Sequence, residues 1–305
     1  MSLGRDDAHD VKSFHSYLQE SRSIIALVGA GLSASSGLAV FTGADGLWEN
    51  QDPFSLATPE AFRSDAARVW RFYDRRRHEA LQAQPNAAHF ALAEASRQLP
   101  GFITMNQNID GLSERADHPG SQLLALHGSL FEVQCTNTQS CEYWREDFTY
   151  SIVSMDSLSV EREHTPTQTQ DTICPDPEIS RPDCQLQGLP NCPRCNSILR
   201  PGVVWFGERL KDEVLLRIRH SFSQPEKIDL MLVIGTAAQV MPAAGYIDVA
   251  RARGARLCFV NTDRNTGTGG NLQNGDWFFE GDAAVIVPIL LEPVTSQGSR
   301  PHIPS

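Results

Sequence analysis

The stretch Ile24-Ile25-Ala26-Leu27-Val28 is followed at once by the turn Gly29-Ala30-Gly31. A short, continuous apolar run of this kind is typical of a strand that is buried on both faces of a parallel sheet. Three later runs, Phe102–Thr104, Leu230–Ile234 and Leu257–Val260, follow the same pattern and also end at polar or glycine-containing turns. With helical stretches between these strands, the sequence predicts an α/β fold around a Rossmann-like parallel sheet.

Two further segments complete the expected architecture. Ala283–Leu291 is the last apolar run, and we interpret it as another buried strand. A helix is expected from about Ser64 to Gln84, because apolar side chains recur there on one face at helical spacing. In an open α/β sheet the ligand lies at the carboxyl ends of the strands, which is where the polar turns fall. The side chains on the helix face are Val69, Phe72, Tyr73 and Ala80.

The composition of the 305 residues fits one large domain, or a large and a small one. Apolar residues make up 41% and charged residues 21%, as is ordinary for globular proteins, and no apolar run is long enough to span a membrane. The net charge of −11 argues against nucleic-acid binding and favours a basic partner, such as a lysine-rich peptide. We expect a monomer. The acidic start Met1–Asp7 does not look like a leader, so we expect the cytoplasm or nucleus, with the mitochondrion as the alternative.

The cysteines favour a metal site over a disulfide framework, because their number is odd and no secretory signal is evident. Cys192 and Cys195 have the C-x2-C spacing of half a zinc site. Cys135 and Cys141 are the expected partners, and four thiolates would form a closed, structural Zn²⁺ site. Five residues separate Cys135 from Cys141, whereas a C-x2-C pair has two. With this wider spacing the metal could be lost, or another cysteine could replace either ligand. The candidate replacements are Cys174 and Cys184.

Polar side chains at the strand ends are candidates for binding a nucleotide. The loop Gly29–Gly37 could let the backbone approach a pyrophosphate at the N-terminus of a following helix. Ala34 stands where the usual dinucleotide fingerprint has glycine, and a tight turn without a ligand is the alternative. Gln107, Asn108 and Asp110 suit ribose hydroxyls and a carboxamide, with a plain Asx turn as the alternative.

Four segments together resemble the sirtuin family of NAD-dependent protein lysine deacylases. They are the glycine loop, Asn106–Asp110, Leu126–Gly128 and Arg200–Glu208, and the resemblance extends from about Phe14 to Leu291. It implies a Rossmann-like NAD-binding domain and a smaller zinc-binding and helical domain, with both ligands in the cleft between them. The implied catalytic domain covers 14–291, with tails at 1–13 and 292–305. Its Rossmann-like parts lie at about 14–50, 98–134 and 200–291, and a helical module lies at about 51–97. A zinc module at about 135–199 contains a flexible insertion at about 155–190.

The resemblance also implies roles for single residues. A lone histidine is usually structural or simply exposed, but His127 corresponds to the family's general base, which takes a proton from a ribose hydroxyl. Asp110 would bind the nicotinamide carboxamide, while Asn108 and Gln107 would orient the ribose. The implied products are nicotinamide, free lysine and O-acyl-ADP-ribose. The implied NAD-binding residues are Gly29, Ala30, Gly31, Ser33, Phe41, Gln107, Asn108, Asp110, Gly235, Thr236, Asn261, Asp263 and Ala283, with Asp282 and Ala283 at the adenine.

The partner implied by the resemblance is an acyl-lysine protein or peptide. Val204-Trp205-Phe206-Gly207 resembles the segment that pairs with the substrate backbone, although a core strand is the alternative. Tyr73 and Arg76 share a helix face and resemble the Tyr-x-x-Arg pair of class III members, which select succinyl-, malonyl- and glutaryl-lysine over acetyl-lysine. A solvated charged face is the alternative for Arg75-Arg76-Arg77. Ala57 matches the small residue that leaves room for a longer acyl chain.

Three positions depart from the family pattern. Thr42 stands where the family has an arginine that helps to hold NAD in its reactive pose. Asn106 replaces a threonine, and Ala237 replaces a serine. The change at Thr42 leaves open an NAD- or ADP-ribose-binding homologue with weak or no catalysis. A protein ADP-ribosyltransferase that uses the same first step is a further alternative.

Overall fold

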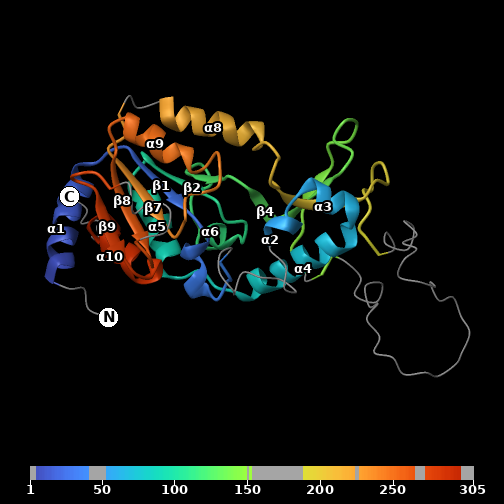
Figure 1. Ribbon diagram of the computed structural model, residues 1–305, viewed down its shortest axis with the longest axis horizontal. Helices are drawn as coiled ribbons and strands as arrows, with labels where there is room; N and C mark the ends of the chain where they lie inside the picture. Colours follow the sequence, from blue (N-terminus) through green and yellow to red (C-terminus); the bar gives the residue numbers. More distant parts are fainter. Residues whose placement is uncertain are drawn as a thin grey trace, which may run out of the picture. The chain divides into compact units, whose positions relative to one another are not determined.

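The computed structural model describes residues 5–40, 53–149, 151–152, 188–223, 227–264 and 272–296 (Figure 1). Phe41, Thr42, Cys174, Cys184 and almost all of the insertion expected at about 155–190 lie outside the described residues. The chain forms two compact units. Unit 1 comprises Met1–Gly46, Ala83–Gly128 and Arg209–Ser305, and unit 2 comprises Leu47–Gln82 and Ser129–Glu208.

Unit 1 is built on a six-stranded sheet in the order β3-β2-β1-β7-β8-β9. Every neighbouring pair is parallel, so the predicted α/β class and Rossmann-like sheet are confirmed. The strand order reverses between β1 and β7, which is where ligands bind in folds of this type. The strands are β1 (Ile24–Val28), β2 (Phe102–Asn106), β3 (Leu123–Ala125), β7 (Leu230–Ile234), β8 (Arg256–Asn261) and β9 (Trp277–Glu280).

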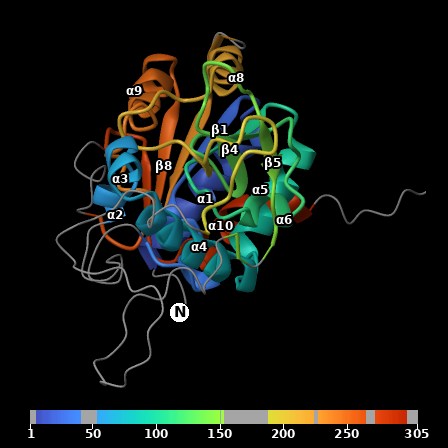
Figure 2. The same cartoon turned by 90° about the vertical axis from the view of Figure 1, so that its right-hand side faces the viewer.

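Helices cover both faces of this sheet, with α1, α5 and α10 on one face and α8 and α9 on the other (Figures 1 and 2). Phe14 from α1, Leu92 from α5 and Leu290 from α10 belong to one buried cluster with the strand residues. No helix within the described ranges is both long and apolar enough to cross a bilayer. The helices are α1 (Arg5–Glu20), α5 (Ala87–Gln98), α6 (Leu112–Arg115), α8 (Asp212–Ser223), α9 (Gly245–Ala252) and α10 (Ala283–Thr295), with 3-10 turns η1 (Ala30–Leu32) and η2 (Ala34–Ser36).

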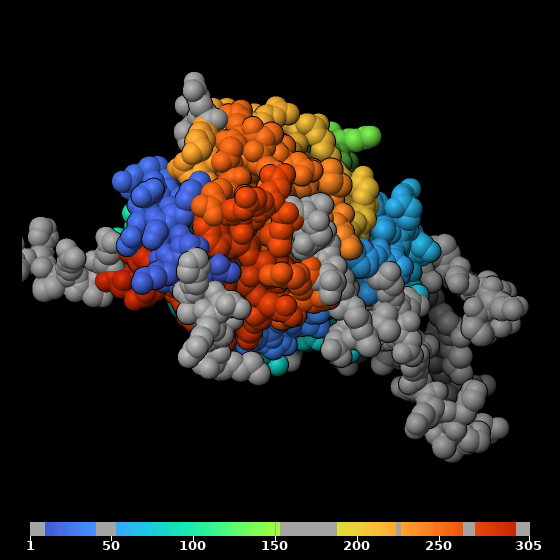
Figure 3. Space-filling view, turned by 60° about the vertical axis from the view of Figure 1, so that its left-hand side comes forward, coloured from blue at the N-terminus to red at the C-terminus, as the bar shows by residue number. Residues whose placement is uncertain are grey.

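The two ends of unit 1 pack against each other at the β9 edge of the sheet. The Phe14 ring meets the Trp277 ring edge-on at 5.3 Å between centroids, and the Trp277 indole N–H donates to Ser13 Oγ at 2.8 Å. Figure 3 shows the blue N-terminal helix beside the red C-terminal part of the chain. Aromatic packing therefore fixes α1 on the sheet.

The interpretation of Ala283–Leu291 as a strand was wrong, since these residues form most of α10. Asp282 caps the helix, and its Oδ1 accepts the Ala284 N–H at 2.9 Å. A continuous apolar run is equally compatible with a helix that is buried on several sides. The true last strand is β9, Trp277–Glu280, which lies just before the cap.

Unit 2 contains a small sheet in the order β5-β4-β6 and the predicted helix. The strands are β4 (Gly128–Cys135), which starts at the last residue of unit 1, β5 (Trp144–Glu146) and β6 (Leu199–Val203); the helices are α2 (Pro53–Leu56), α3 (Pro59–Ser64) and α4 (Ala66–Gln82). The helix expected over Ser64–Gln84 is α4, and all four side chains of its predicted apolar face are buried. Thr58 Oγ1 caps α3 by accepting the Ala61 N–H at 3.0 Å.

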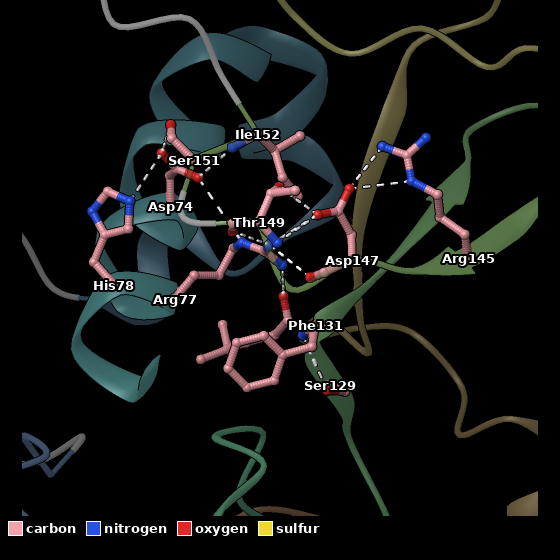
Figure 4. A network of polar contacts seen from close by, with 11 residues as sticks. Asp74, Arg77, His78, Ser129, Phe131, Arg145, Asp147, Thr149, Ser151 and Ile152 are labelled. Atoms are coloured by element: carbon pink, nitrogen blue, oxygen red, sulfur yellow. Dashed lines mark hydrogen bonds and ion pairs between the residues drawn. The ribbon is translucent and has the colours of Figure 1, made fainter. Parts of the chain in front are cut away.

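A buried arginine on α4 and its neighbour Asp74 bind residues 147–149 and 151–152 to the helix (Figure 4). Arg77 donates through Nη1 to the Leu130 carbonyl and through Nη2 to the carbonyls of Asp147 and Thr149, at 2.7 and 3.0 Å. Asp74, one turn earlier, accepts the Ile152 N–H at 3.1 Å. The run Arg75-Arg76-Arg77 is therefore not one solvated face, because the side chains are 65%, 16% and 1% exposed.

Candidate active site

The glycine loop brings the ends of β1 and β7 into contact within unit 1. The Gly31 N–H donates to the Gly235 carbonyl at 2.8 Å. A Cβ atom on Gly31 would lie 2.7 Å from Gly235 Cα, and one on Gly29 would lie 2.7 Å from Thr236 Cβ. These glycines are therefore needed for the close approach of two turns.

The loop is not followed by the expected α-helix in the described residues up to Val40. Two 3-10 turns stand there instead, so Ala34 is part of a tight turn, and Gly37 ends it with a φ of 87°. The N–H groups of Leu32 and Ser33 donate within the loop, to the Gly29 and Ala30 carbonyls. The argument from a helix N-terminus therefore does not apply to this part of the chain.

Ser33 lies at the centre of a buried polar network at the ends of β1 and β2. Its Oγ donates to Asp110 Oδ2 at 2.7 Å and accepts a hydrogen bond from Asn108 Nδ2 at 3.2 Å. The other Asp110 oxygen accepts the Leu112 N–H at 2.9 Å. Burial raises the pKa of the Asp110 carboxyl group, while the bond from Ser33 acts in the opposite direction. Three of the predicted NAD residues are thus held as one unit.

His89 belongs to the same network and was not among the predicted site residues. Its Nδ1 lies 3.2 Å from the backbone nitrogen of Asn86, which can only donate, so the proton of the neutral ring is on Nε2. Nε2 lies 3.4 Å from Ser33 Oγ, and burial lowers the pKa of His89 to about 4. In the sequence, His89 could have been recognised only as part of a helix cap, because Asn86 lies three residues before it, which is the spacing of a helix-capping pair.

Gln107 connects three neighbouring strand ends. Its Nε2 donates to the Val28 carbonyl at 3.2 Å and to Thr236 Oγ1 at 3.1 Å. Asn106, the departure from the family pattern, accepts the Asn108 N–H through Oδ1 at 3.0 Å. The amide side chains therefore fix the carboxyl edge of the sheet between β2, β1 and β7.

His127 is held so that one ring nitrogen is available as a base. Its Nδ1 lies 2.9 Å from the Gln107 carbonyl oxygen, which can only accept, so Nδ1 carries the proton and Nε2 carries the lone pair. The Leu126 N–H donates to the Asn106 carbonyl at 2.8 Å and fixes the backbone beside it. Burial lowers the pKa of His127, and the bond to Gln107 opposes this effect. The ring is thus neutral at pH 7 and can accept a proton.

The remaining predicted NAD residues lie at the ends of β8 and β9. Asn261 Nδ2 donates to the Thr236 carbonyl at 3.2 Å, which links β8 to the turn after β7. Asp263 is exposed two residues later, and Ala283 is buried as the first residue of α10. Asp282, besides capping α10, accepts a hydrogen bond from Ser35 Oγ. Phe41 lies outside the described residues.

The four cysteines predicted as metal ligands converge in unit 2. Their Sγ atoms all lie within 4.8 Å of one another, with 3.4 Å between Cys135 and Cys195 and 3.6 Å between Cys141 and Cys192. Tetrahedral Zn²⁺ with bonds of about 2.3 Å places thiolates roughly 3.8 Å apart, so the cluster fits a structural zinc ion. The loose spacing of Cys135 and Cys141 does not prevent convergence, because Cys135 ends β4 and the Cys141 N–H donates back to the Asn137 carbonyl.

The predicted substrate residues gather around α4 and the turn after β6. Val204–Gly207 is not a strand but a turn, with a φ of 85° at Gly207. The Phe206 N–H donates to the Ala57 carbonyl at 2.9 Å. The Tyr73 and Trp205 rings lie 6.5 Å apart, and burial raises the pKa of the Tyr73 phenol, which therefore stays protonated.

Arg76 remains on the same side of α4 as Tyr73. Its guanidinium carbon lies 5.5 Å from the Phe72 ring centroid, and its Nη1 lies 4.0 Å from Glu79. Arg76 is three positions after Tyr73 in the helix, so the two side chains are neighbours on its surface. Unit 2 thus presents a phenol and a guanidinium together.

Comparisons with known proteins agree with this arrangement. The family model described as "Sir2 family" matches residues 29–242. An NAD-dependent protein deacylase of Candida albicans is 40% identical over 93% of this chain and 97% of its own length. The NAD-dependent protein deacylase sirtuin-5, mitochondrial, of Danio rerio is 33% identical over 93% of this chain and 87% of its own length. The crystal structure of a Sir2 homolog–NAD complex superposes with a TM-score of 0.72 at 34% identity, covering 97% of each chain.

Proposed function

This chain belongs to the Sir2 family of NAD-dependent protein deacylases, and we propose that it acts best on lysine side chains that carry a short dicarboxylic acyl group. Succinyl, malonyl and glutaryl groups are the candidates. The observation that carries this proposal is the pairing of Tyr73 and Arg76 on one side of α4. A protonated phenol and a guanidinium form charge-assisted hydrogen bonds to a carboxylate, whereas an acetyl group offers them no charge.

The polar network of unit 1 supports NAD binding. Ser33, Asn108, Asp110 and Gln107 present hydroxyl, amide and carboxylate groups at the carboxyl edge of the sheet, and these groups suit the ribose hydroxyls and carboxamide of NAD. Bound NAD supplies the ribose to which the acyl group is transferred. We assign His127 as the general base, because Nε2 is its unprotonated nitrogen and can take a proton from a ribose hydroxyl.

Acyl-lysine proteins or peptides are the proposed partners, and unit 2 would recognise them. The turn Val204–Gly207 and Ala57 are joined by a backbone hydrogen bond beside α4. Ala57 is buried and carries only a methyl group, which would leave room for a longer acyl chain. The two units therefore supply different parts of the proposed reaction.

A second candidate function is NAD or ADP-ribose binding without efficient catalysis. The observation that favours it is Thr42, which replaces the arginine of the family with a short, uncharged side chain. This candidate expects NAD to bind while nicotinamide is not released.

The test is nicotinamide release from NAD with succinyl-lysine and acetyl-lysine peptides of one sequence. We expect a higher kcat/KM for the succinyl peptide, and Arg76→Met should lower it by about 10- to 100-fold, because a hydrogen bond between charged groups contributes roughly 1.5–3 kcal/mol. Arg75→Met is the matched control, since Arg75 is the neighbouring arginine and is mostly exposed. Its kinetics should equal those of the wild type.

Two results would contradict the proposal. A higher kcat/KM for the acetyl peptide in the wild type would remove the assigned role of Tyr73 and Arg76. NAD binding without release of nicotinamide in the presence of either peptide would favour the non-catalytic candidate, and Thr42→Arg would then be expected to restore release.

A further inference from the structure

We propose that the indole N–H of Trp205 is a further hydrogen-bond donor to the carboxylate of the acyl group, beside the Tyr73 phenol. Trp205 would thereby determine acyl specificity as well as shape the turn in which it lies. The inference rests on the proposed dicarboxylic acyl preference and names a group that enforces it. It is carried by a buried indole N–H for which the described residues provide no hydrogen bond of good geometry.

The Trp205 side chain is buried, with the residue only 3% exposed, and its Nε1 has no hydrogen-bond partner among the described residues. Leaving such a donor unpaired is unfavourable, so most buried donors in proteins are satisfied. Among the described tryptophans of unit 2, Trp70 is also buried and follows this rule, since its Nε1 donates to the Leu199 carbonyl at 2.9 Å. An unpaired indole N–H next to predicted substrate residues therefore indicates an acceptor that arrives with the ligand.

The Trp205 ring is held so that its N–H cannot easily turn elsewhere. The Arg200 guanidinium carbon lies 3.5 Å from the ring centroid, and the Phe62 ring packs at 5.1 Å between centroids. Arg200 is itself fixed by two bonds to Glu208, from Nη1 to Oε1 at 2.5 Å and from Nη2 to Oε2 at 2.8 Å. Glu208 Oε2 also accepts the Trp205 backbone N–H at 2.8 Å. This arrangement preorganises the indole for a ligand.

The position of the indole indicates which part of a ligand it meets. The Trp205 and Tyr73 ring centroids lie 6.5 Å apart, and the indole N–H opposes the larger effect of burial on the pKa of the Tyr73 phenol, so the N–H lies near the phenol oxygen. The indole N–H and the phenol O–H are therefore neighbouring donors. An acetyl group ends in a methyl group and offers no acceptor there, whereas a dicarboxylic acyl group ends in two oxygens that can accept from both donors.

The Arg200 guanidinium is not assigned to bind the carboxylate of the acyl group. Its two Nη atoms are occupied by Glu208, and Nη2 also donates to the Val203 carbonyl at 3.0 Å. Arg200 therefore acts as a positioning residue for the indole, while Tyr73 and Trp205 supply neutral donors and Arg76 supplies the positive charge.

The test is Trp205→Phe, which keeps an aromatic ring against Arg200 and removes the N–H. We expect kcat/KM with the succinyl-lysine peptide to fall about tenfold or more, and kcat/KM with the acetyl-lysine peptide to stay within about twofold. Trp144→Phe is the matched control, because Trp144 is an indole of the same unit that is 62% exposed. It should leave both values unchanged.

The wild type can have a higher kcat/KM for the succinyl peptide than for the acetyl peptide, and Trp205→Phe can keep the same ratio. That result would overturn the inference while leaving the proposed function intact. An equal loss with both peptides would also overturn it, because the indole would then serve the peptide backbone or the fold. A wild type without any succinyl preference would remove the proposed function and the inference together.

A second measurement applies if Trp205→Phe does not fold. The chain has five tryptophans, so wild-type protein labelled with ¹⁵N-tryptophan gives five indole N–H resonances. We expect one of them to move downfield when the succinyl-lysine peptide is added and to stay in place with the acetyl-lysine peptide. A spectrum in which no indole resonance distinguishes the two peptides would overturn the inference.

Discussion

Unit 1 and unit 2 hold their functional side chains in place by different means. In unit 1 the network around Ser33 and Asp110 lies at the edge of a six-stranded parallel sheet with a large apolar core. In unit 2 a small sheet is supplemented by four converging thiols and by the buried Arg77. The fold of unit 1 therefore rests mainly on its apolar core, whereas unit 2 depends more strongly on polar groups for the fold itself.

The largest expected effect is the loss of zinc from unit 2. Structural zinc sites contribute about 10 kcal/mol or more to folding, so chelation or Cys192→Ser should unfold unit 2. Activity would be abolished, while the sheet of unit 1 stays protected from hydrogen exchange. Zinc content and segment-resolved hydrogen exchange measure this difference. If β4 and β6 stay protected from hydrogen exchange in zinc-free protein, unit 2 does not depend on the metal for its fold, and the proposed difference between the units is wrong.

The next effect is confined to chemistry in unit 1. His127→Ala should lower the rate of NAD-dependent deacylation by about 10²- to 10⁴-fold, as expected for the loss of a general base. The free energy of unfolding should change by less than about 1 kcal/mol, because the side chain is only partly buried. Steady-state kinetics and urea denaturation check the two parts. A large loss of stability would mean that the site residues of unit 1 are needed for its fold, as the polar groups of unit 2 are.

The comparable substitution in unit 2 should affect stability first. Arg77→Met leaves the carbonyls of Leu130, Asp147 and Thr149 without their donor and should cost about 3–5 kcal/mol in the free energy of unfolding. Arg75→Met should stay within about 0.5 kcal/mol of the wild type, since Arg75 is an exposed neighbour. Urea denaturation at constant zinc concentration compares them. Equal stabilities would refute the structural role of the buried arginine.

The free energy of unfolding of unit 1 should fall at acidic pH, because two of its buried histidines become protonated. Burial lowers the pKa of His89 and of His118 to about 4, below the ordinary value near 6.5. Protonation therefore favours the unfolded chain, and stability that is complete above pH 6.5 is lost as the pH falls toward 4. Each histidine accounts for up to about 3 kcal/mol of this loss. Unfolding curves at pH 7 and pH 4.5 measure it, and His89→Gln combined with His118→Gln should flatten the dependence.

The smallest expected effect concerns Ser33 alone. Ser33→Ala removes the donor to Asp110 and should raise the KM for NAD while changing the free energy of unfolding by about 1–2 kcal/mol. Kinetics with NAD varied at saturating peptide will show the change. An unaltered KM for NAD would separate this network from cofactor binding.

The parts of the fold that followed directly from the sequence are those in which local pattern and burial coincide. Ile24–Val28 is buried at every residue, so its uniform apolar character identified a central parallel strand. Ala283–Leu291 has the same character but belongs to a helix, and the difference lies in the cap at Asp282 rather than in the apolar residues.

The candidate site divides in a similar way. Cys192 and Cys195 could be predicted from spacing, because the two ligands lie in one turn. The pairing of His89 with Asn86 has a recognisable spacing, but its contact with Ser33 could not be predicted, because it joins positions that are far apart in the chain. The three arginines at 75–77 form one sequence pattern, yet the helix places each in a different environment.

The central claim is that unit 2 selects a charged acyl group for the chemistry supplied by unit 1. The most direct test mixes succinyl-lysine and acetyl-lysine peptides of identical sequence in equal amounts with the wild-type protein and NAD, and quantifies the O-acyl-ADP-ribose products by mass spectrometry. We expect the succinyl product to exceed the acetyl product by about tenfold or more, the ratio that one charge-assisted hydrogen bond provides. Equal amounts, or an excess of the acetyl product, would contradict the claim.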